Sequence, residues 1–185
     1  MKIPYLLYPI LFSSSILAQG PEFKMQTIDD KVGIGYGVQL ADMNADGKVD
    51  VLLVDKDKVA WYENPSWKKR IIVDHLTKRD HVCLTARDLN GDGRAELALG
   101  GEWNPGDTIN SGAVLYLYPK GEKWEHRALH HEPTTHRMHW VKGKGGKYSL
   151  VVKPLHGRGN RNNAGDPLKV LAYEYPASPE KNDWP

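Results

Sequence analysis

The sequence has few of the features that mark several protein classes. Its one cysteine, Cys83, excludes a disulfide within the chain and is best interpreted as a small buried apolar residue. After the N-terminal segment, no apolar run is long enough to span a bilayer. The 25 lysines and arginines are nearly balanced by 23 acidic residues, which leaves a net charge of +2. Because the basic residues are also dispersed, we expect no strongly charged partner and no nucleic acid.

The N-terminus has the composition of an export signal, and the rest of the 185 residues has the length of one domain. In residues 1–18, Lys2 gives a positive start, an apolar stretch follows, and small residues lead to Ala18. An uncleaved membrane anchor is the alternative interpretation of this segment. We expect a secreted or periplasmic protein with no membrane contact beyond the signal peptide.

Two stretches carry the most specific pattern. Residues 42–50 read DMNADGKVD, residues 88–96 read DLNGDGRAE, and a short apolar run follows each. Oxygen-bearing side chains stand at positions 1, 3, 5 and 9, glycine stands at position 6, and position 7 would contribute its backbone carbonyl. Ca²⁺ takes roughly six to eight oxygen ligands from such a flexible loop. An EF-hand would need glutamate at position 12, where this chain has Leu53 or Leu99.

The pattern therefore predicts two Ca²⁺-binding loops that each join two strands, with metal-free polar turns as the alternative. The candidate calcium ligands are Asp42, Asn44, Asp46, Lys48 and Asp50 in the first loop, and Asp88, Asn90, Asp92, Arg94 and Glu96 in the second.

These loops belong to a longer repeat, which predicts an all-β protein made of β-propeller blades with four antiparallel strands each. The loops start 46 residues apart, at Asp42 and Asp88, and this period suits one blade. We expect blades at 35–75 and 80–131 and an incomplete blade at 135–185. In the third unit the segment KGKGGK at 142–147 replaces the calcium loop and has no carboxylate. We therefore expect no calcium there.

The strand count does not close a ring. Residues 22–30 match the fourth strands of the later units and are expected to form a separate outer strand, whereas the third unit lacks its own. A closed propeller has at least about four blades, and an open stack leaves sheet edges exposed. We therefore expect residues 22–185 to be the front part of a longer propeller, or one part of a self-assembly that supplies the missing blades.

Strand direction predicts a second candidate site at the rim opposite the calcium loops. The starts of first strands and the exits of second strands meet there, and loops of several blades form concave binding places. Histidine supplies a base near neutral pH, arginine can hold a carboxylate, and tryptophan can stack on a sugar. The candidate catalytic residues are His81, His136, His156 and Arg158, and the candidate substrate-binding residues are Trp103, Asn104, Trp140 and Asn160. A divalent metal at this histidine rim is a further possibility, and a purely structural role for these histidines is the alternative.

A family resemblance rests on these same residues. The pattern D-x-N-x-D-G-x-x-D/E between two strands resembles the FG-GAP or VCBS calcium repeat of secreted propellers. More narrowly, RDHVCLTARDLNGDGRAELALGGEWNPGDTINSGAVLYLYP and HEPTTHRMHWV resemble the propeller of aldos-2-ulose dehydratase/isomerase-like proteins and of rhamnose–glucuronate lyases. The narrower resemblance implies β-elimination on a sugar. The alternative is a non-catalytic, calcium-stabilised propeller that binds glycan or protein.

Overall fold

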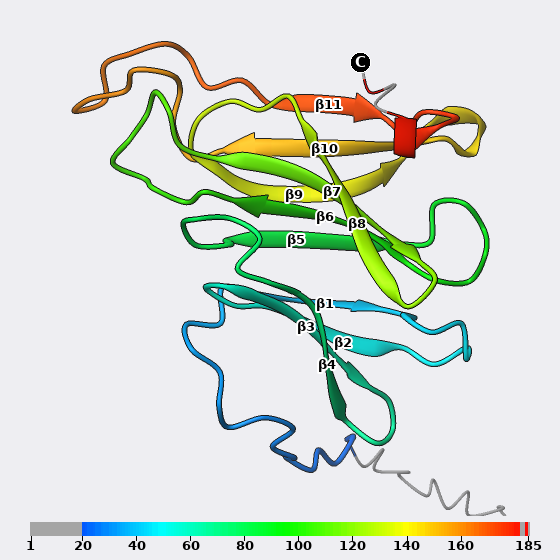
Figure 1. Cartoon of the computed structure of the whole chain (residues 1–185). Helices are drawn as coiled ribbons and strands as arrows, with labels where there is room; N and C mark the ends of the chain where they lie inside the picture. The colour runs from blue at the N-terminus through cyan, green and yellow to red at the C-terminus, as the bar shows by residue number, and fades with distance from the viewer. Residues whose placement is uncertain (1–19, 182–183, 185) are drawn as a thin grey trace, which may run out of the picture.

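The computed structural model describes residues 20–181 and 184, so the expected signal peptide at 1–18 lies outside the described residues. The described residues form three antiparallel sheets (Figure 1). Blade one contains β1 (Gly37–Ala41), β2 (Asp50–Val54), β3 (Lys58–Glu63) and β4 (Lys68–Asp74). Blade two contains β5 (Cys83–Arg87), β6 (Glu96–Gly101), β7 (Ala113–Lys120) and β8 (Lys123–Leu129). Blade three contains β9 (Thr135–Lys142), β10 (Tyr148–Pro154) and β11 (Leu171–Glu174). Two short 3₁₀ turns, η1 (Lys144–Gly146) and η2 (Pro179–Lys181), complete the elements.

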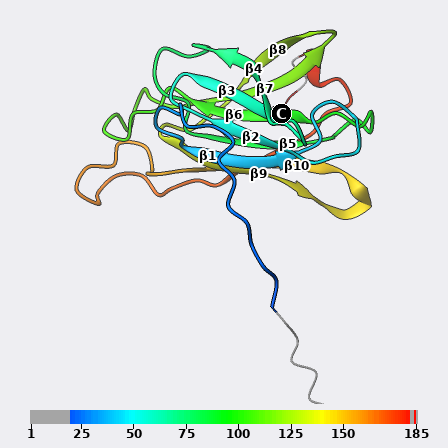
Figure 2. The same ribbon diagram turned by 90° about the horizontal axis from the view of Figure 1, so that it is seen from below.

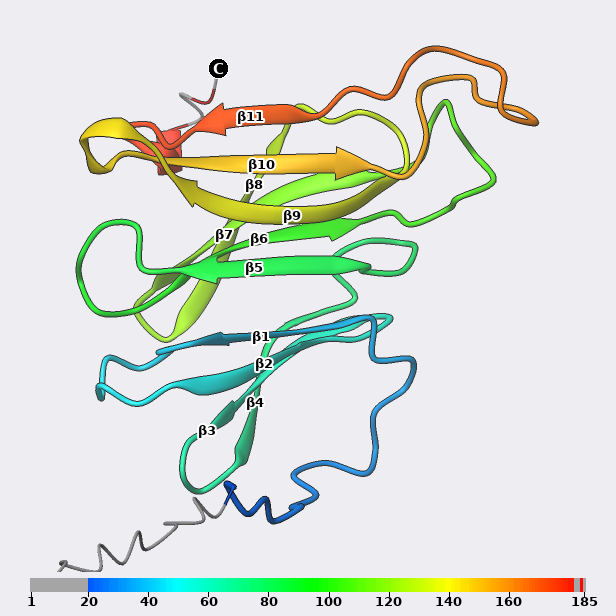
Figure 3. The same cartoon turned by 180° about the vertical axis from the view of Figure 1, so that it is seen from behind.

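Strand order within each sheet follows the chain, which confirms the predicted all-β, propeller-like blades. The order is β1-β2-β3-β4 in blade one, β5-β6-β7-β8 in blade two, and β9-β10-β11 in blade three. The first strands β1, β5 and β9 lie side by side and run in the same direction (Figure 3). They are therefore the innermost strands, and the later strands of each blade extend outward from them.

Blade two is buried on both faces because its side chains alternate between two cores. Leu97 and Leu99 of β6 face the core shared with blade one, whereas Ala98 between them faces the core shared with blade three. In β7, likewise, Leu115 packs against blade one and Tyr116 against blade three. A strand covered on both faces needs apolar residues at every position, which explains the continuous run in β6.

Gly100 of β6 lies close to side chains of both neighbouring first strands, β5 and β9. A Cβ at this position would lie 2.6 Å from Sγ of Cys83 and 3.1 Å from Cγ2 of Thr135. Cys83 is buried, as the sequence predicted, and burial raises the pKa of its thiol to about 12. Gly100 is thus required by packing between blades two and three rather than by a turn.

The loops divide between two ends of the stack. The connections β1–β2, β5–β6 and β9–β10 lie at one end, on the right in Figure 1, which we call the loop face. The connections β6–β7 and β10–β11 lie at the opposite end, which we call the rim. A strand of five to eight residues carries the chain from one end to the other.

The expected outer strand at 22–30 does not form. No strand is assigned there, and Phe23 and Met25 are 92% and 91% exposed. The first described residues lead away from the sheets (Figure 2). A strand needs a paired neighbour to satisfy its backbone groups, and no strand of the described residues pairs with this segment. None of the described helices is long and apolar enough to span a membrane.

Candidate functional site

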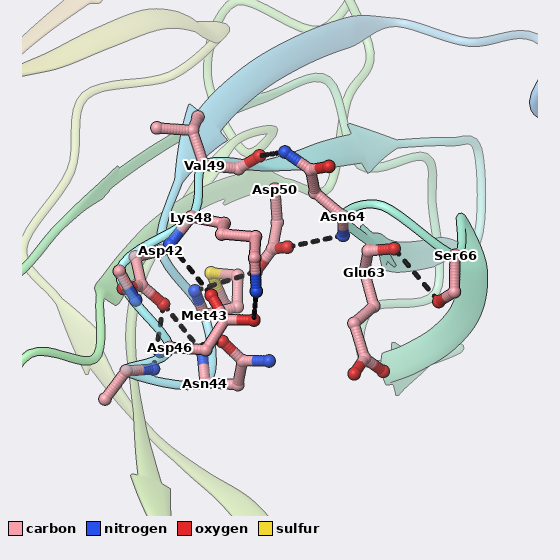
Figure 4. A network of polar contacts seen from close by, with 12 residues as sticks. Asp42, Met43, Asn44, Asp46, Lys48, Val49, Asp50, Glu63, Asn64 and Ser66 are labelled. Carbon is pink, nitrogen blue, oxygen red and sulfur yellow. Dashed lines mark hydrogen bonds and ion pairs between the residues drawn. The ribbon is translucent and has the colours of Figure 1, made fainter.

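The first loop, residues 42–50, is held by its own acidic and amide side chains (Figure 4). Oδ1 of Asp42 accepts hydrogen bonds from the backbone N–H groups of Asn44 and Ala45, at 3.2 and 2.8 Å. Its Oδ2 accepts one from the N–H of Gly47 at 2.8 Å. The side-chain oxygens of Asn44 and Asp46 each accept from the N–H two residues later, at 3.2 and 2.8 Å. These bonds wrap the chain around the side-chain oxygens.

The second loop, residues 88–96, repeats this arrangement position by position. Asp88 accepts from the N–H groups of Gly91 and Gly93, at 2.7 and 3.0 Å. Asn90 and Asp92 each accept from the N–H two residues later, both at 2.8 Å. Because two separate sequences adopt one hydrogen-bond pattern, the spacing of their polar residues determines the loop conformation.

Positions 4 and 6 of both loops have left-handed backbone conformations. Position 6 is Gly47 (φ 80°) or Gly93 (φ 90°), where glycine was predicted for the tight turn. Position 4 is Ala45 (φ 62°) in the first loop and Gly91 (φ 83°) in the second. Alanine is disfavoured in this region because its Cβ approaches the following carbonyl oxygen. The first loop therefore contains a strained residue that the second loop avoids.

Position 9 turns its carboxylate inward. Asp50 is fully buried and accepts from the N–H groups of Met43 and Asn64, at 3.0 and 2.8 Å. Glu96, 1% exposed, accepts from the N–H of Leu89 at 2.8 Å and from Nδ2 of Asn90 at 2.6 Å.

Burial raises the pKa of Glu96 to about 7. Two hydrogen bonds to backbone N–H groups oppose this rise, and the nearby negative charges of Asp92 and Asp88 add to it. A buried carboxylate beside two others is a place where a cation would be stabilised.

The donor set of both loops fits Ca²⁺. It consists of carboxylate, amide and carbonyl oxygens, which this cation prefers. In the described residues, no three histidine, cysteine, aspartate or glutamate side chains converge at metal-binding distances. Asp46 instead pairs with Nζ of Lys48 at 3.1 Å, and hydrogen bonds from Lys48 lower its pKa. An incoming cation would displace this ammonium.

The two loops touch each other across the boundary between blades one and two. The N–H of Ala95 donates to the carbonyl oxygen of Asp42 at 3.1 Å. A Cβ at Gly93 would lie 3.1 Å from the Cβ of Ala45. The conformation of one loop therefore affects the position of the other.

At the rim, the structure brings some of the candidate residues together. The ring of Trp103, from the β6–β7 loop, stacks on His136 of β9 with centroids 5.2 Å apart. Burial lowers the pKa of His136, and the positive charges of Arg137, Lys153 and His156 lower it further. Nδ1 of His136 is buried without a hydrogen-bond partner in the described residues. His136 thus lies beside an indole, in surroundings that disfavour its charged form.

Arg158, Asn104 and Asn160 hold the rim loops in place. One Arg158 amino group donates to the carbonyl oxygen of Ile109 at 3.0 Å, and the other lies 3.4 Å from a Glu132 carboxylate oxygen. Oδ1 of Asn104 accepts from the N–H of Gly106 at 3.1 Å. The carbonyl oxygen of Asn160 accepts from the Thr108 hydroxyl at 3.2 Å. These contacts join the β6–β7 loop to the β10–β11 loop, and they already engage the guanidinium expected to bind substrate.

Two candidates do not lie on the rim surface, which corrects their expected positions. His81 is fully buried before β5, and burial lowers the pKa of its imidazole. Trp140 packs near the loop face, with ring centroids 6.1 Å from Tyr175 and 6.3 Å from Trp184. Trp140 follows His136 by four residues on β9. Because a strand rises about 3.3 Å per residue, Trp140 lies toward the opposite end of the blade.

Sequence reasoning missed the residue that anchors the rim. Thr134 is fully buried with a left-handed backbone (φ 56°), an outlier for a β-branched residue. Its N–H donates to Oγ of Ser111 at 3.2 Å, and its Oγ1 accepts from the N–H of His156 at 3.1 Å. Nothing in the sequence around Thr134 indicated this role. Strain of this kind is often found where side chains must be held for function.

Comparison with protein-family models gives a match for part of the chain. Residues 42–99 match the family model of the FG-GAP-like repeat. The match begins at the first residue of the first loop and ends in β6, so it contains both loops and the strands between them. It supports an FG-GAP repeat β-structure in this part of the chain. A search of curated proteins finds no match.

Proposed function

We propose that this protein is an exported, calcium-binding propeller segment of the FG-GAP type, in which residues 42–50 and 88–96 each hold one Ca²⁺. The observation that carries the proposal is a hydrogen-bond pattern shared by the two loops. Position 1 accepts from the N–H groups of positions 4 and 6, and the buried acidic residue at position 9 accepts from the N–H of position 2. The first loop would bind through Asp42, Asn44, Asp46, the Lys48 carbonyl and Asp50. The second would bind through Asp88, Asn90, Asp92, the Arg94 carbonyl and Glu96.

Calcium would act here as a structural ion. Each loop carries three carboxylates, and in the second loop the charges of Asp88 and Asp92 oppose ionisation of the buried Glu96. A cation that binds only the folded state offsets this repulsion and raises stability by mass action. Because the two loops touch through Ala95 and Asp42, calcium would also fix blade one against blade two.

Replacement of Asp46 and Asp92 by alanine tests this proposal. Each variant should lose one equivalent of calcium in a calorimetric titration and part of the calcium-dependent rise in melting temperature. Asp166→Ala is the matched control, because this exposed aspartate lies outside both loops. A calcium-loaded parent whose melting temperature is unchanged by chelation would contradict the proposal.

A second candidate function is sugar-directed elimination at the rim, as in the dehydratase- and lyase-like propellers. It is favoured by His136, which stacks against Trp103 and whose pKa is lowered by burial and by nearby positive charges, including His156. His136 would take the proton from the carbon beside a carboxylate while the bond from the adjacent carbon to its oxygen substituent breaks. The electron pair of the C–H bond forms the new double bond, and His156 would protonate the leaving oxygen.

This second function is tested with His136→Gln and His156→Gln on a uronate-containing polysaccharide, by following absorbance of the unsaturated product. Both variants should lose turnover while binding and fold are retained. His126→Gln, on the outer strand β8, is the control and should retain activity. Glycan binding without turnover in the parent would favour the non-catalytic propeller.

We also propose that other copies or further blades complete the sheet edges left open at β11 and beside β1. In the described residues β11 has a neighbour on one side only. On β1, Val38 and Leu40 are 57% and 63% exposed. Light scattering should therefore detect a discrete oligomer of the mature protein, with a monodisperse monomer as the contrary result.

A further inference from the structure

A groove of about 740 Å³ lies between blades one and two, beside the first loop. Its inner side is formed by Met43 and Asn44 of the loop and by the buried Trp61 of β3. Arg94 of the second loop and Trp124 of β8 line the blade-two side. This volume lies within the range of about 300 to 1,000 Å³ that is usual for small-molecule sites. Both blades that form the groove have all four strands, so it does not depend on the open edges of the stack.

The same kind of groove recurs one blade later, with the opposite charge. Positions 2 and 3 of the second loop line a groove of about 690 Å³ between blades two and three, and Tyr116 takes the place of Trp61. Trp61 and Tyr116 occupy equivalent positions in their blades. Trp61 pairs across the sheet with Leu52 and Tyr116 pairs with Ala98, and each of these partners is two residues after position 9 of its loop. The acidic residues lining this second groove are Asp92, Glu96 and Glu180, with Lys147 as a basic one. The basic residues lining the first groove are Lys68, Lys69, Arg70 and Arg94, with Glu122 as an acidic one.

Two of the basic groups in the first groove already have carboxylate partners. Arg70 donates through Nε and an amino group to Glu63, at 2.8 and 2.6 Å, and its guanidinium lies over Trp61. Lys69 pairs with Asp29 at 2.7 Å. Among the described residues, Lys68 and Arg94 form no such pair, so they carry the positive charge available to a ligand.

Arg94 is the residue that points to an anionic ligand. Its Nε is buried and has no hydrogen-bond partner in the described residues. A buried donor without an acceptor costs free energy, and a guanidinium is best satisfied by a carboxylate that bonds two of its N–H groups. Arg94 stands at position 7 of the second loop. A residue at this position is predicted to bind calcium through its backbone carbonyl. Its side chain therefore remains available for the groove.

We propose that the groove between blades one and two binds an acidic oligosaccharide. Arg94 and Lys68 pair with its carboxylates, and the Trp124 indole supports the apolar face of a sugar ring. An indole offers a flat apolar surface with one polar edge, which suits a ring that is apolar on its faces and polar around its rim. The site is separate from the histidine rim.

Isothermal titration with trigalacturonate, in calcium-containing buffer, tests this site, with maltotriose as the neutral sugar of similar size. We expect saturable binding of the acidic trisaccharide at a stoichiometry of one and a much weaker response to maltotriose. Arg94→Gln should weaken binding by about tenfold or more, because a hydrogen bond to a charged group is lost. The exposed Lys68→Gln should weaken binding by about two- to fivefold, as expected for a surface ion pair.

Lys147→Gln in the second groove is the matched control and should leave the affinity within about twofold of the parent, because Lys147 faces the other groove. Since Lys68 is exposed, its variant tests the site even if Arg94→Gln fails to fold. Absence of saturable binding at millimolar ligand would overturn the proposal, as would equal losses in the Lys68 and Lys147 variants. Equally tight binding of hexaglutamate would assign the groove to an acidic peptide instead. Calcium binding by the parent is measured in a separate titration. Failure of the calcium proposal can therefore be distinguished from failure of the oligosaccharide proposal.

Discussion

Removal of calcium should make the stability of the folded protein fall as the pH rises from about 5 to about 7, because of Glu96. In the folded, metal-free protein, burial and two neighbouring carboxylates raise the pKa of Glu96 from 4.5 to about 7. In the unfolded chain the group titrates near its ordinary value. Between these pH values the folded state holds a proton that the unfolded state has lost. The stability associated with this proton is fully present below pH 4.5 and is lost as the pH rises through 7.

The size of the effect follows from the pKa difference. A difference between 4.5 and about 7, at about 1.4 kcal/mol per pKa unit, corresponds to about 3 kcal/mol of unfolding free energy. Calcium should reverse this trend, because its binding requires the ionised carboxylate and its charge removes the repulsion from Asp88 and Asp92. The stabilisation by calcium should therefore be larger at pH 7 than at pH 5.

Urea unfolding at pH 5, 6 and 7, with EDTA or with calcium, measures both effects. Burial also lowers the pKa values of His81 and His136, so these two groups favour folding as the pH rises. The informative quantity is therefore the difference between the parent and Glu96→Gln, in which the histidine contributions cancel. Without calcium, the unfolding free energy of Glu96→Gln should rise relative to that of the parent as the pH increases, by up to about 3 kcal/mol at pH 7. A pH dependence identical to that of the parent would refute the reasoning, and the exposed Glu122→Gln serves as the control.

Three further predictions rest on the backbone and the blade interfaces. Ala45→Gly should stabilise the protein by up to about 1 kcal/mol in urea unfolding, and Gly91→Ala should destabilise it by about as much. The reason is that both positions have left-handed backbones, which glycine adopts more easily than alanine. Effects of the same sign in both variants would contradict this. Gly100→Ala should cost about 1 to 3 kcal/mol through its clash with Cys83, and Cys83→Ala should restore part of the loss in the double variant. Burial would raise the pKa of Asp55, but backbone N–H donors hold it at about 2, so its contribution to stability is lost as the pH falls from about 4 to 2. Asp55→Asn should remove that acid-sensitive step and speed hydrogen exchange at the residues 33–35 that donate to it.

The repeat could be predicted from the sequence because each blade is specified locally. Alternating apolar residues, the glycine at position 6 and the polar residues of the loops recur at one spacing, and the eleven described strands lie where that spacing placed them. The expected strand at 22–30 shows the limit of this reasoning. Its sequence matches β4 and β8, but a strand also needs backbone hydrogen bonds to a neighbouring strand, and no described strand pairs with this segment.

The rim was less predictable because its geometry depends on contacts between blades. Strand direction indicated that the β6–β7 and β10–β11 loops would meet, and the hydrogen bonds from Thr108 to Asn160 and from Arg158 to Ile109 join them. It could not indicate that Glu132 would engage Arg158, since Glu132 precedes β9 in a segment with no repeating pattern. It also could not indicate the strained backbone of Thr134, which depends on Ser111 of another blade.

The two ends of the stack are connected by the same strands, and this limits how calcium could influence the rim. β5 leads directly into the second loop, and β9, which begins one residue before His136, packs against it. A calcium ion that fixed the second loop would therefore also fix β5, the strand against which β9 packs. The second loop and the start of β9 lie at opposite ends of these strands (Figure 3). Any effect of calcium on rim chemistry should thus follow the stability of blade two, so that substrate affinity and turnover change only where chelation also lowers the melting temperature.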